Sequence, residues 1–265
     1  MKNFYLIGEN LNNSLSPYIH NYVFNILGIK AKYKIKAINF KSDIPIILTN
    51  LSKGDIQGIN ITNPYKVKIF HQILSCDSVA QKIGSINCIS REDNHPKGFN
   101  TDWLGFMKTI KGITINNVKI IGYGGAGKAV EYALLSLGIK NIQIYTRKKI
   151  NHSNNIVYKN INEIFNNNQK KGLIVNATPY HFINENNIDN FLNLSSEKML
   201  WIDLLYTKLS TKKELFFNEK LYKNGLDMLI YQAFESLNIW FRKDITKDVD
   251  FDDLKSYLER KNNVI

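Results

Sequence analysis

Short apolar stretches alternate with segments of helical period along the whole chain. The apolar residues of segment 17–27 share one face of a helix, and Gly28 is placed to end it. In the N-terminal part the predicted strands are 4–7, 32–38, 56–61, 85–90 and 97–99, and the predicted helices are 17–27, 43–51 and 64–74. This alternation predicts an α/β fold with mostly parallel strands.

A second series of strands and helices begins near Asp102. Its predicted strands are 118–121, 142–145, 173–175 and 200–204, and its predicted helices are 103–111, 126–137, 211–223, 227–241 and 251–260. The Asn-rich stretches 149–160 and 166–168 are interpreted as surface loops. No Pro/Gly/Ser linker marks a boundary, so topology alone suggests two domains. We expect residues 1–101, completed by 237–265, to bind substrate, residues 102–236 to form a Rossmann-type domain, and the active site to lie between them.

The composition is that of a globular protein, because 44% of the 265 residues are hydrophobic and 12% are aromatic. No apolar run is long enough to span a membrane, and the N-terminal residues lack a signal-peptide cleavage site. The two cysteines, Cys76 and Cys88, cannot form a disulfide framework, and no histidine has metal-ligand spacing. We therefore expect a cytoplasmic protein without a metal site.

The net charge of +12 raises the question of nucleic-acid binding. The lysines are spread among Asn and Ile residues along the chain, however, and no basic helix carries a reading motif. The pattern favours a solvated basic surface, which also suits anionic small molecules. Neither a nucleic acid nor a membrane is an expected partner.

One stretch of the second series follows the pattern strand, Gly-x-Gly-x-x-Gly, helix. The first glycine permits a tight turn, the second lets backbone approach a pyrophosphate, and the third lets the helix pack close to the strand. The loop residues are Gly122, Gly124, Gly125, Ala126 and Gly127. An ordinary turn is the alternative, but the flanking strand and helix favour a dinucleotide-binding loop.

The end of the next strand indicates which dinucleotide is bound. An NAD site would carry Asp or Glu there, about 20 residues after the loop, to bind the ribose 2′-hydroxyl. This chain carries Thr146, Arg147 and Lys148 instead. A guanidinium suits a 2′-phosphate and can stack on adenine, so NADP(H) is predicted, although a basic surface turn would have the same sequence.

Polar turns in the N-terminal part carry hydroxyl groups that could bind a small substrate. Ser14 and Ser16 lie on the same side of an extended stretch and could together hold a carboxylate. Ser16 also has a structural explanation, since it could cap the following helix, and so does Thr62 in the turn before Pro64, where capping alone could explain it.

Four further residues have the chemistry of a polar active site. Lys66 and Asp102, each ending a short polar turn just before the glycine loop, suggest acid–base chemistry on a small polar substrate, and Asn87 and Gln232 are further polar candidates. Taken singly, each again has a structural explanation. Lys66 could be a surface lysine, Asp102 a helix cap, Asn87 a strand-end residue and Gln232 part of a helix face.

Taken together, these segments resemble the shikimate dehydrogenase family over nearly the whole chain. The matching segments are Ser14-x-Ser16-Pro-x-x-His20-Asn21, Asn60-Ile-Thr62-x-Pro64-Tyr-Lys66, Asn87, Asn100-Thr101-Asp102, the glycine loop 122–127, Thr146-Arg147-Lys148, Asn176-Ala-Thr178, Asp203-Leu-Leu-Tyr206 and Gly225-Leu-Asp-Met228 with Gln232. The resemblance implies an oxidoreductase of two α/β domains. It would transfer hydride reversibly between NADP(H) and shikimate or 3-dehydroshikimate, a step of aromatic amino-acid biosynthesis.

The resemblance also implies roles for individual residues. Lys66 would exchange a proton with the substrate oxygen, and Asp102 would orient that lysine. The residues implied to contact substrate are Ser14, Ser16, Thr62, Asn87, Tyr206 and Gln232. Those implied to hold the cofactor are Gly122, Gly124, Gly125, Ala126, Gly127, Thr146, Arg147, Lys148, Asn176, Thr178, Leu204, Gly225 and Met228.

Departures from the family pattern leave alternatives open. Thr146 and Lys148 replace the usual Asn and Thr beside Arg147, so a quinate/shikimate dehydrogenase with mixed NAD and NADP use is one alternative. A catalytically silent relative that senses a ligand is a second alternative, since a fold does not fix a function. The presence of both Lys66 and Asp102 argues against the sensor. Monomer and homodimer both remain open.

Overall fold

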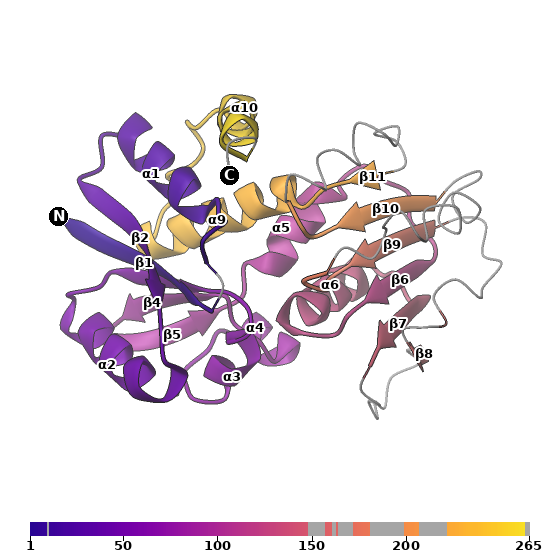
Figure 1. Ribbon diagram of the computed structural model, residues 1–265, viewed down its shortest axis with the longest axis horizontal. Helices are drawn as coiled ribbons and strands as arrows, with labels where there is room; N and C mark the ends of the chain where they lie inside the picture. The colour runs from indigo at the N-terminus through magenta and orange to yellow at the C-terminus, as the bar shows by residue number, and fades with distance from the viewer. Residues whose placement is uncertain are drawn as a thin grey trace. The chain divides into compact units, whose positions relative to one another are not determined.

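The computed structural model describes residues 1–9, 11–147, 157–160, 163, 172–180, 199–206 and 222–262. The chain forms two compact units, one of residues 1–106 and 229–265 and the other of residues 107–228 (Figure 1). The first boundary between the units, after residue 106, falls inside α5 (Asp102–Thr109), and the second, after residue 228, falls inside α9 (Leu226–Phe241). The sequence suggested boundaries at 101 and 237. No helix among the described residues is long and apolar enough to cross a membrane.

The first unit is built on a five-stranded sheet of order β2-β1-β3-β4-β5. The strands are β1 (Lys2–Gly8), β2 (Ala31–Ala37), β3 (Gly58–Ile61), β4 (Cys88–Glu92) and β5 (His95–Phe99). Strand β1 pairs in parallel with β2 and β3, but β4 is antiparallel to both β3 and β5. The sheet of this half is therefore mixed: β4 alone runs against the other four strands, a reversal that the expectation of mostly parallel strands did not include.

The antiparallel pairing follows from a two-residue turn between β4 and β5. Asp93 and Asn94 form this turn, with φ angles of 47° and 63°. Asp and Asn tolerate the left-handed region, and two successive positive φ values make the turn whose twist matches a hairpin. The chain therefore reverses after β4, and β5 ends at the edge of the sheet where β4 begins.

Helices cover both faces of this sheet (Figure 1). Helices α2 (Phe40–Lys53), α3 (Lys66–Phe70) and α4 (Ser78–Ile83) lie over one face. Their apolar side chains share a core with Ile7, Ile59 and Ile61 of the strands. On the other face, α1 (Ser16–Ile26) and α9 contribute aromatic rings that pack on Phe4, and α10 (Phe251–Asn262) packs on α1.

One glycine of β3 is required by this packing. A Cβ atom at Gly58 would lie 2.4 Å from the indole of Trp240, which is closer than any side chain tolerates. The Trp240 indole N–H donates to the carbonyl oxygen of Ile89 at 3.0 Å, so the ring is fixed against the sheet. Helix α9 is thereby packed closely against β3 and β4.

The second unit contains a six-stranded parallel sheet of order β11-β10-β9-β6-β7-β8. Its strands are β6 (Val118–Ile121), β7 (Ile142–Thr146), β8 (Val157–Asn160), β9 (Gly172–Asn176), β10 (Met199–Asp203) and β11 (Tyr222–Lys223). The chain runs outward from β6 through β7 to β8, then returns to β9 on the other side of β6. The order reverses between β6 and β9, the position where doubly wound sheets bind nucleotides.

Three details differ from the sequence-based expectations. Residues 157–160 form β8, although that stretch was interpreted as a loop, and residues 222–223 form β11 where a helix was predicted to end. The rest of that helix, 211–221, and the loop 166–168 lie outside the described residues. Helix α4 was not predicted, although Asp77 caps it through the backbone N–H of Ala80 and Gly84 ends it in the left-handed conformation.

Candidate active site

The carboxyl-end edge of the first sheet gathers the polar residues singled out in the N-terminal part. Ser14 follows β1, and Lys66 follows β3. Because β4 and β5 are antiparallel, Asn87 directly precedes β4 and Asp102 follows β5 at this same edge. The hairpin thus brings together residues that an all-parallel sheet would have placed at opposite edges.

Lys66 and Asp102 form an ion pair at this edge. Lys66 is the first residue of α3 and Asp102 the first of α5, and the Lys66 Nζ lies 2.6 Å from Asp102 Oδ2. The lysine side chain is 18% exposed and the aspartate only 5%, so the ammonium group is the more accessible partner. This geometry disfavours a free surface lysine at position 66.

Asn87 holds the other oxygen of the aspartate. Its Nδ2 donates to Asp102 Oδ1 at 2.8 Å, and its Oδ1 accepts the backbone N–H of Thr101 at 2.6 Å. Because Asn87 Oδ1 accepts the Thr101 N–H, the Asn87 amide nitrogen is the atom that faces the carboxylate. Both Asp102 oxygens therefore accept hydrogen bonds from side chains, an arrangement that neither helix capping nor strand-end polarity requires.

Gln232 of α9 reaches the same cluster. Its Oε1 lies 3.2 Å from Asn87 Nδ2, and its Nε2 donates to the carbonyl oxygen of Leu229 at 2.9 Å. The residue is buried, which an exposed polar helix face does not explain. The two amides and the carboxylate therefore form one hydrogen-bonded group.

Behind this group lies a second row of buried polar residues that the sequence did not single out. Ser236 Oγ is 3.2 Å from Thr101 Oγ1 and 2.9 Å from Asn60 Nδ2, and Asn60 Oδ1 accepts from the hydroxyl of Tyr33 at 2.9 Å. Thr101 and Asn60 belong to matched motifs and could have been noticed there. Tyr33 and Ser236 carry no local signal, because the strand order brings Tyr33 of β2 to Asn60, and the packing of α9 on the sheet brings Ser236 there.

The serines lie at the start of α1. Leu15 is the N-cap of this helix, so the expectation that Ser16 caps it is wrong. The Ser16 carbonyl accepts from His20 Nδ1 at 2.7 Å, and its backbone N–H donates to Ser14 Oγ at 3.3 Å. Burial lowers the pKa of His20 to about 4, so this histidine is neutral near neutral pH.

Thr62 lies in the turn after β3, where its methyl group packs against Gly8. A Cβ atom at Gly8 would lie 2.5 Å from Thr62 Cγ2. The Thr62 carbonyl accepts from the backbone N–H of Tyr65, so the turn is closed by backbone atoms. Burial raises the pKa of the Cys88 thiol in β4 to about 12, so the thiol stays protonated at neutral pH and is a poor nucleophile.

In the second unit, the glycine loop joins β6 to α6 (Gly125–Ser136). Gly122 has a φ of +90°, and a Cβ at Gly127 would lie 2.2 Å from the Gly122 oxygen, so both positions need glycine. A Cβ at Gly124, in contrast, would meet no atom within 4 Å. The open side at Gly124, in front of the N-terminus of α6, fits the close approach of a pyrophosphate.

The next strand across the switch point ends beside this loop, because Ile121 pairs with Asn176. Asn176 Oδ1 accepts from the backbone N–H and the hydroxyl of Thr178, and its Nδ2 donates to Asp203 Oδ1 at 3.0 Å. Thr178 Cγ2 packs so closely on Gly122 that a Cβ atom there would lie only 2.7 Å from it. The segment Asn176–Thr178 therefore supports the loop from the side of β9.

The remaining residues implied to hold cofactor or substrate in this unit lie at or shortly after strand ends, except Met228, which lies in the first turn of α9. Thr146 ends β7 and Arg147 is exposed immediately after it, whereas Lys148 lies outside the described residues. Leu204 and Tyr206 follow β10, and both are partly exposed. Met228 is buried, and Gly225 is needed where it stands, because a Cβ there would lie 2.2 Å from the Leu204 oxygen.

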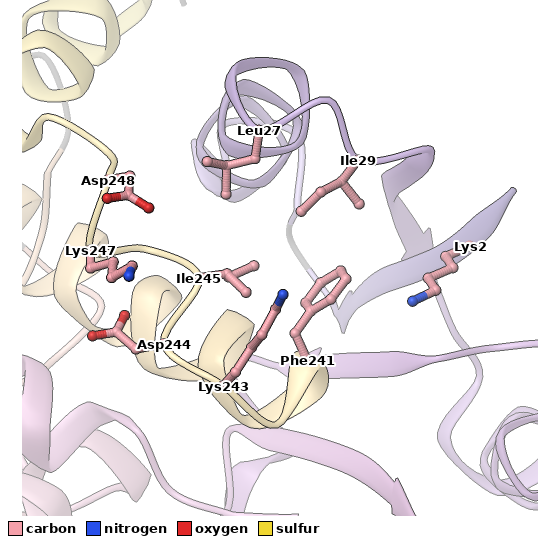
Figure 2. Close-up of a pocket in the computed structure, with 9 residues that line it drawn as sticks. All are labelled: Lys2, Leu27, Ile29, Phe241, Lys243, Asp244, Ile245, Lys247 and Asp248. Carbon is pink, nitrogen blue, oxygen red and sulfur yellow. The ribbon is translucent and has the colours of Figure 1, made fainter.

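The first unit also has a surface hollow, shown in Figure 2. Its lining residues are Lys2, Leu27, Ile29, Phe241, Lys243, Asp244, Ile245, Lys247 and Asp248. Lys2 begins β1, and Leu27 ends α1, so the hollow lies at the amino-end edge of the sheet. It contains none of the residues that the sequence identified as candidate site residues. The described residues also contain no group of His, Cys, Asp and Glu that could hold a metal ion.

Comparison with known proteins identifies the family. Residues 6–89 match the family model described as the shikimate dehydrogenase substrate binding domain. The chain is 34% identical over 254 residues to a shikimate dehydrogenase (NADP(+)) of Clostridium beijerinckii, covering 89% of this chain and 90% of that protein. It is also 34% identical to the protein of that name from Saccharolobus solfataricus, covering 93% and 92%.

Solved structures agree with the sequence comparison. The crystal structure of shikimate dehydrogenase 1 from Peptoclostridium difficile superposes with a TM-score of 0.77 at 30% identity, covering all of this chain and 98% of that one. The expected α/β fold, with a Rossmann-like parallel sheet and an N-terminal substrate-binding domain, is confirmed. The chain belongs to the shikimate dehydrogenase family.

Proposed function

We propose that this protein catalyses the reversible reduction of 3-dehydroshikimate to shikimate with NADPH. In the forward direction the ketone at C3 receives a hydride on carbon and a proton on oxygen, and NADPH becomes NADP⁺. The first unit binds the substrate and the second binds the dinucleotide. Membership of the family and the Lys66–Asp102 pair at the edge of the first sheet support this proposal.

Lys66 supplies the proton in this proposal. Its ammonium group is partly exposed, so it can reach a substrate oxygen, while Asp102 holds it in one orientation. As the C3 oxygen gains negative charge, Lys66 transfers a proton to it, and in the reverse direction the neutral amine takes that proton back. Asn87 keeps the carboxylate turned toward Lys66, because its Nδ2 occupies the other oxygen.

The substrate is held by neutral hydrogen-bonding groups. Ser14 and Ser16 bind the ring carboxylate, and Ser16 is held in place by the contact of its carbonyl with His20. Thr62, Asn87 and Gln232 bind the ring hydroxyls, and the resemblance to the family implies Tyr206 as a further substrate contact. A site of this kind rejects analogues that leave one of its buried polar groups without a partner.

The second unit fits NADP(H). The glycine loop would hold the pyrophosphate against the N-terminus of α6, and Arg147 with Thr146 would hold the 2′-phosphate. The bound dinucleotide supplies the hydride that reduces C3. Asn176, Thr178 and Gly225 shape the walls on which the rest of the cofactor would lie.

The proposal is tested by an activity assay that measures NADPH consumption and shikimate formation together. Purified protein is mixed with 3-dehydroshikimate and NADPH, and the loss of NADPH absorbance is compared with the amount of shikimate formed. The expected result is one shikimate for each NADPH oxidised, with the reverse reaction from shikimate and NADP⁺. Absence of turnover in both directions, in a protein that circular dichroism shows to be folded, would overturn the proposal. The contact between Lys66 and Asp102 makes a silent relative the less favoured reading.

A further inference from the structure

Tyr123 lies between the first two glycines of the glycine loop, and its side chain is anchored to two other elements. Its hydroxyl donates to Glu131 Oε2 of α6 at 2.5 Å. Its ring meets the ring of Tyr158 on β8 edge to face, with centroids 5.7 Å apart and planes at 75°. The loop is therefore tied by one side chain to the helix that follows it and to a strand beyond β7.

The acceptor of this hydrogen bond is a buried carboxylate. Glu131 is only 9% exposed and lies in the middle of α6. Burial and the neighbouring Glu131 carboxylate raise the pKa of Tyr123 well above its usual value, so the phenol stays protonated and remains a donor. A charge-assisted hydrogen bond to a buried carboxylate is among the stronger contacts that a neutral side chain makes.

The anchor matters because the loop has few side chains of its own, although the segment Asn176–Thr178 supports it at Gly122. In the sequence Gly122-Tyr123-Gly124-Gly125-Ala126-Gly127, only Tyr123 and Ala126 have side chains. Gly122 already adopts a left-handed conformation, and no atom lies within 4 Å of a Cβ built at Gly124. Tyr123 thus carries the long-range contact that fixes the peptide groups on either side of it.

We propose that Tyr123 and Glu131 are positioning residues that hold the glycine loop ready for the pyrophosphate of the dinucleotide. This inference rests on the proposed function, since it takes the loop to be the dinucleotide site. An anchored loop loses less conformational freedom when it binds, so the anchor contributes to affinity without touching the nicotinamide. The pyrophosphate is common to NADPH and NADH, so the contribution is the same for both.

The first test removes the hydrogen bond and keeps the ring. In Tyr123→Phe we expect the Kd of NADPH, titrated by quenching of protein fluorescence, to rise about three- to tenfold, where tenfold corresponds to about 1.4 kcal/mol. The KM for NADH should rise by the same factor, while kcat and the KM for 3-dehydroshikimate stay unchanged. In the ligand-free variant the amides of the loop should exchange hydrogen faster. Tyr132→Phe, a change to the neighbouring residue of Glu131 in α6, is the matched control.

The second test separates the effect of the Tyr123–Glu131 hydrogen bond from that of the Glu131 charge. Glu131→Gln removes the charge but keeps an acceptor oxygen, so it should retain nearly wild-type affinity. Glu131→Leu removes the acceptor and should match Tyr123→Phe, and the double variant Tyr123→Phe/Glu131→Leu should be no weaker than either single one. Its melting temperature should recover toward wild type, because replacing both partners leaves no unpaired buried group. Stability would then recover in the double variant while the affinity for NADPH stays at the level of the single variants.

The outcomes separate this inference from the proposed function. If wild type binds NADPH and reduces 3-dehydroshikimate while Tyr123→Phe binds NADPH with unchanged Kd, the positioning role is wrong and the function stands. A fall in melting temperature without a change in Kd has the same meaning. If wild type neither binds NADPH nor turns over substrate, both fall together.

Discussion

The imidazole of His20 lies stacked on the phenol ring of Tyr33, with centroids 3.9 Å apart and planes 9° from parallel. His20 Nδ1 contacts the Ser16 carbonyl, and the Tyr33 hydroxyl donates to Asn60 Oδ1. This stacked pair therefore connects the start of α1, which carries a proposed carboxylate-binding serine, with the buried row behind Asn87. His20 Nε2 is buried and has no hydrogen-bond partner among the described residues.

The burial of His20 predicts a pH dependence of stability. Its pKa falls from 6.5 to about 4 on folding, so the folded state favours the neutral ring. The stability present above pH 6.5 is lost as the pH falls from 6.5 to 4, by about 3 kcal/mol for a shift of this size. His20→Asn, which keeps a donor for the Ser16 carbonyl, should flatten this part of the curve. The check is thermal unfolding of both proteins across that pH range, and parallel curves would contradict the prediction.

The proposed role of Lys66 predicts a catalytic loss without a binding loss. Lys66→Ala should lower kcat by roughly 10²- to 10⁴-fold, the usual range for a positioned acid–base group. The affinity for NADPH should be unchanged, because the lysine belongs to the first unit and the glycine loop to the second. Lys68→Ala, an exposed lysine on the same short helix, is the control in steady-state assays. Near-normal kcat in Lys66→Ala would remove this lysine from the mechanism.

Arg147 predicts the cofactor preference. No carboxylate ends β7, so NADP(H) should be preferred over NAD(H). Arg147→Ala should raise the KM for NADPH and leave that for NADH nearly unchanged, since only NADPH has a 2′-phosphate. The comparison is with Lys140→Ala, an exposed lysine before β7. Equal weakening for both cofactors would show that Arg147 acts through adenine stacking or folding instead.

Substrate recognition predicts discrimination against quinate, which carries an added hydroxyl on a saturated ring beside the carboxylate. A buried hydroxyl without a partner costs ~1–3 kcal/mol, so kcat/KM for shikimate should exceed that for quinate at least ~10-fold. Ser14→Ala should raise the KM for shikimate more than it lowers kcat, as expected for a contact equal in ground and transition states. Comparable efficiency on both acids would favour the quinate/shikimate alternative.

A buried lysine of the second unit predicts a gain in stability. Lys119 of β6 is 1% exposed, and its Nζ has no hydrogen-bond partner among the described residues. Burial and the nearby charge of Lys159 lower its pKa, so the folded state disfavours the ammonium. Lys119→Met should therefore raise the melting temperature, by the equivalent of about 1 kcal/mol or more for an unpaired buried charge.

The pH dependence of this gain has a defined sign. A lysine with a lowered folded-state pKa costs stability while it is protonated, and the cost disappears as the pH rises toward 10.5, the usual value of a lysine. The advantage of Lys119→Met should thus shrink in alkaline buffer. Lys140→Met, an exposed substitution, should show neither the gain nor its pH dependence. A destabilised Lys119→Met protein would show that the ammonium group has a favourable role.

The sequence alone determined most of the local structure. Helical period, turn residues and the glycine pattern act over a few residues, so α1, β6 and the loop from Gly122 to Gly127 could be predicted where they occur. Lys66 and Asp102 were identifiable for the same reason, because each lies in a short polar motif at the start of a helix. The strands at 157–160 and 222–223 were missed, because strands of two to four residues without alternation carry little local signal.

Only the tertiary structure decided how these parts meet. The turn at Asp93–Asn94 reverses the chain, and this reversal brings Asn87 to Asp102 at one edge of the sheet. The Asn60–Ser236 hydrogen bond joins residues 176 positions apart, and no local sequence pattern predicts such a contact. The sequence also did not predict that Glu131 accepts a hydrogen bond from Tyr123, since a glutamate in a helix is ordinarily exposed. Local propensity acts through neighbouring residues, whereas strand pairing and the packing of helices on sheets choose which distant polar groups are buried together.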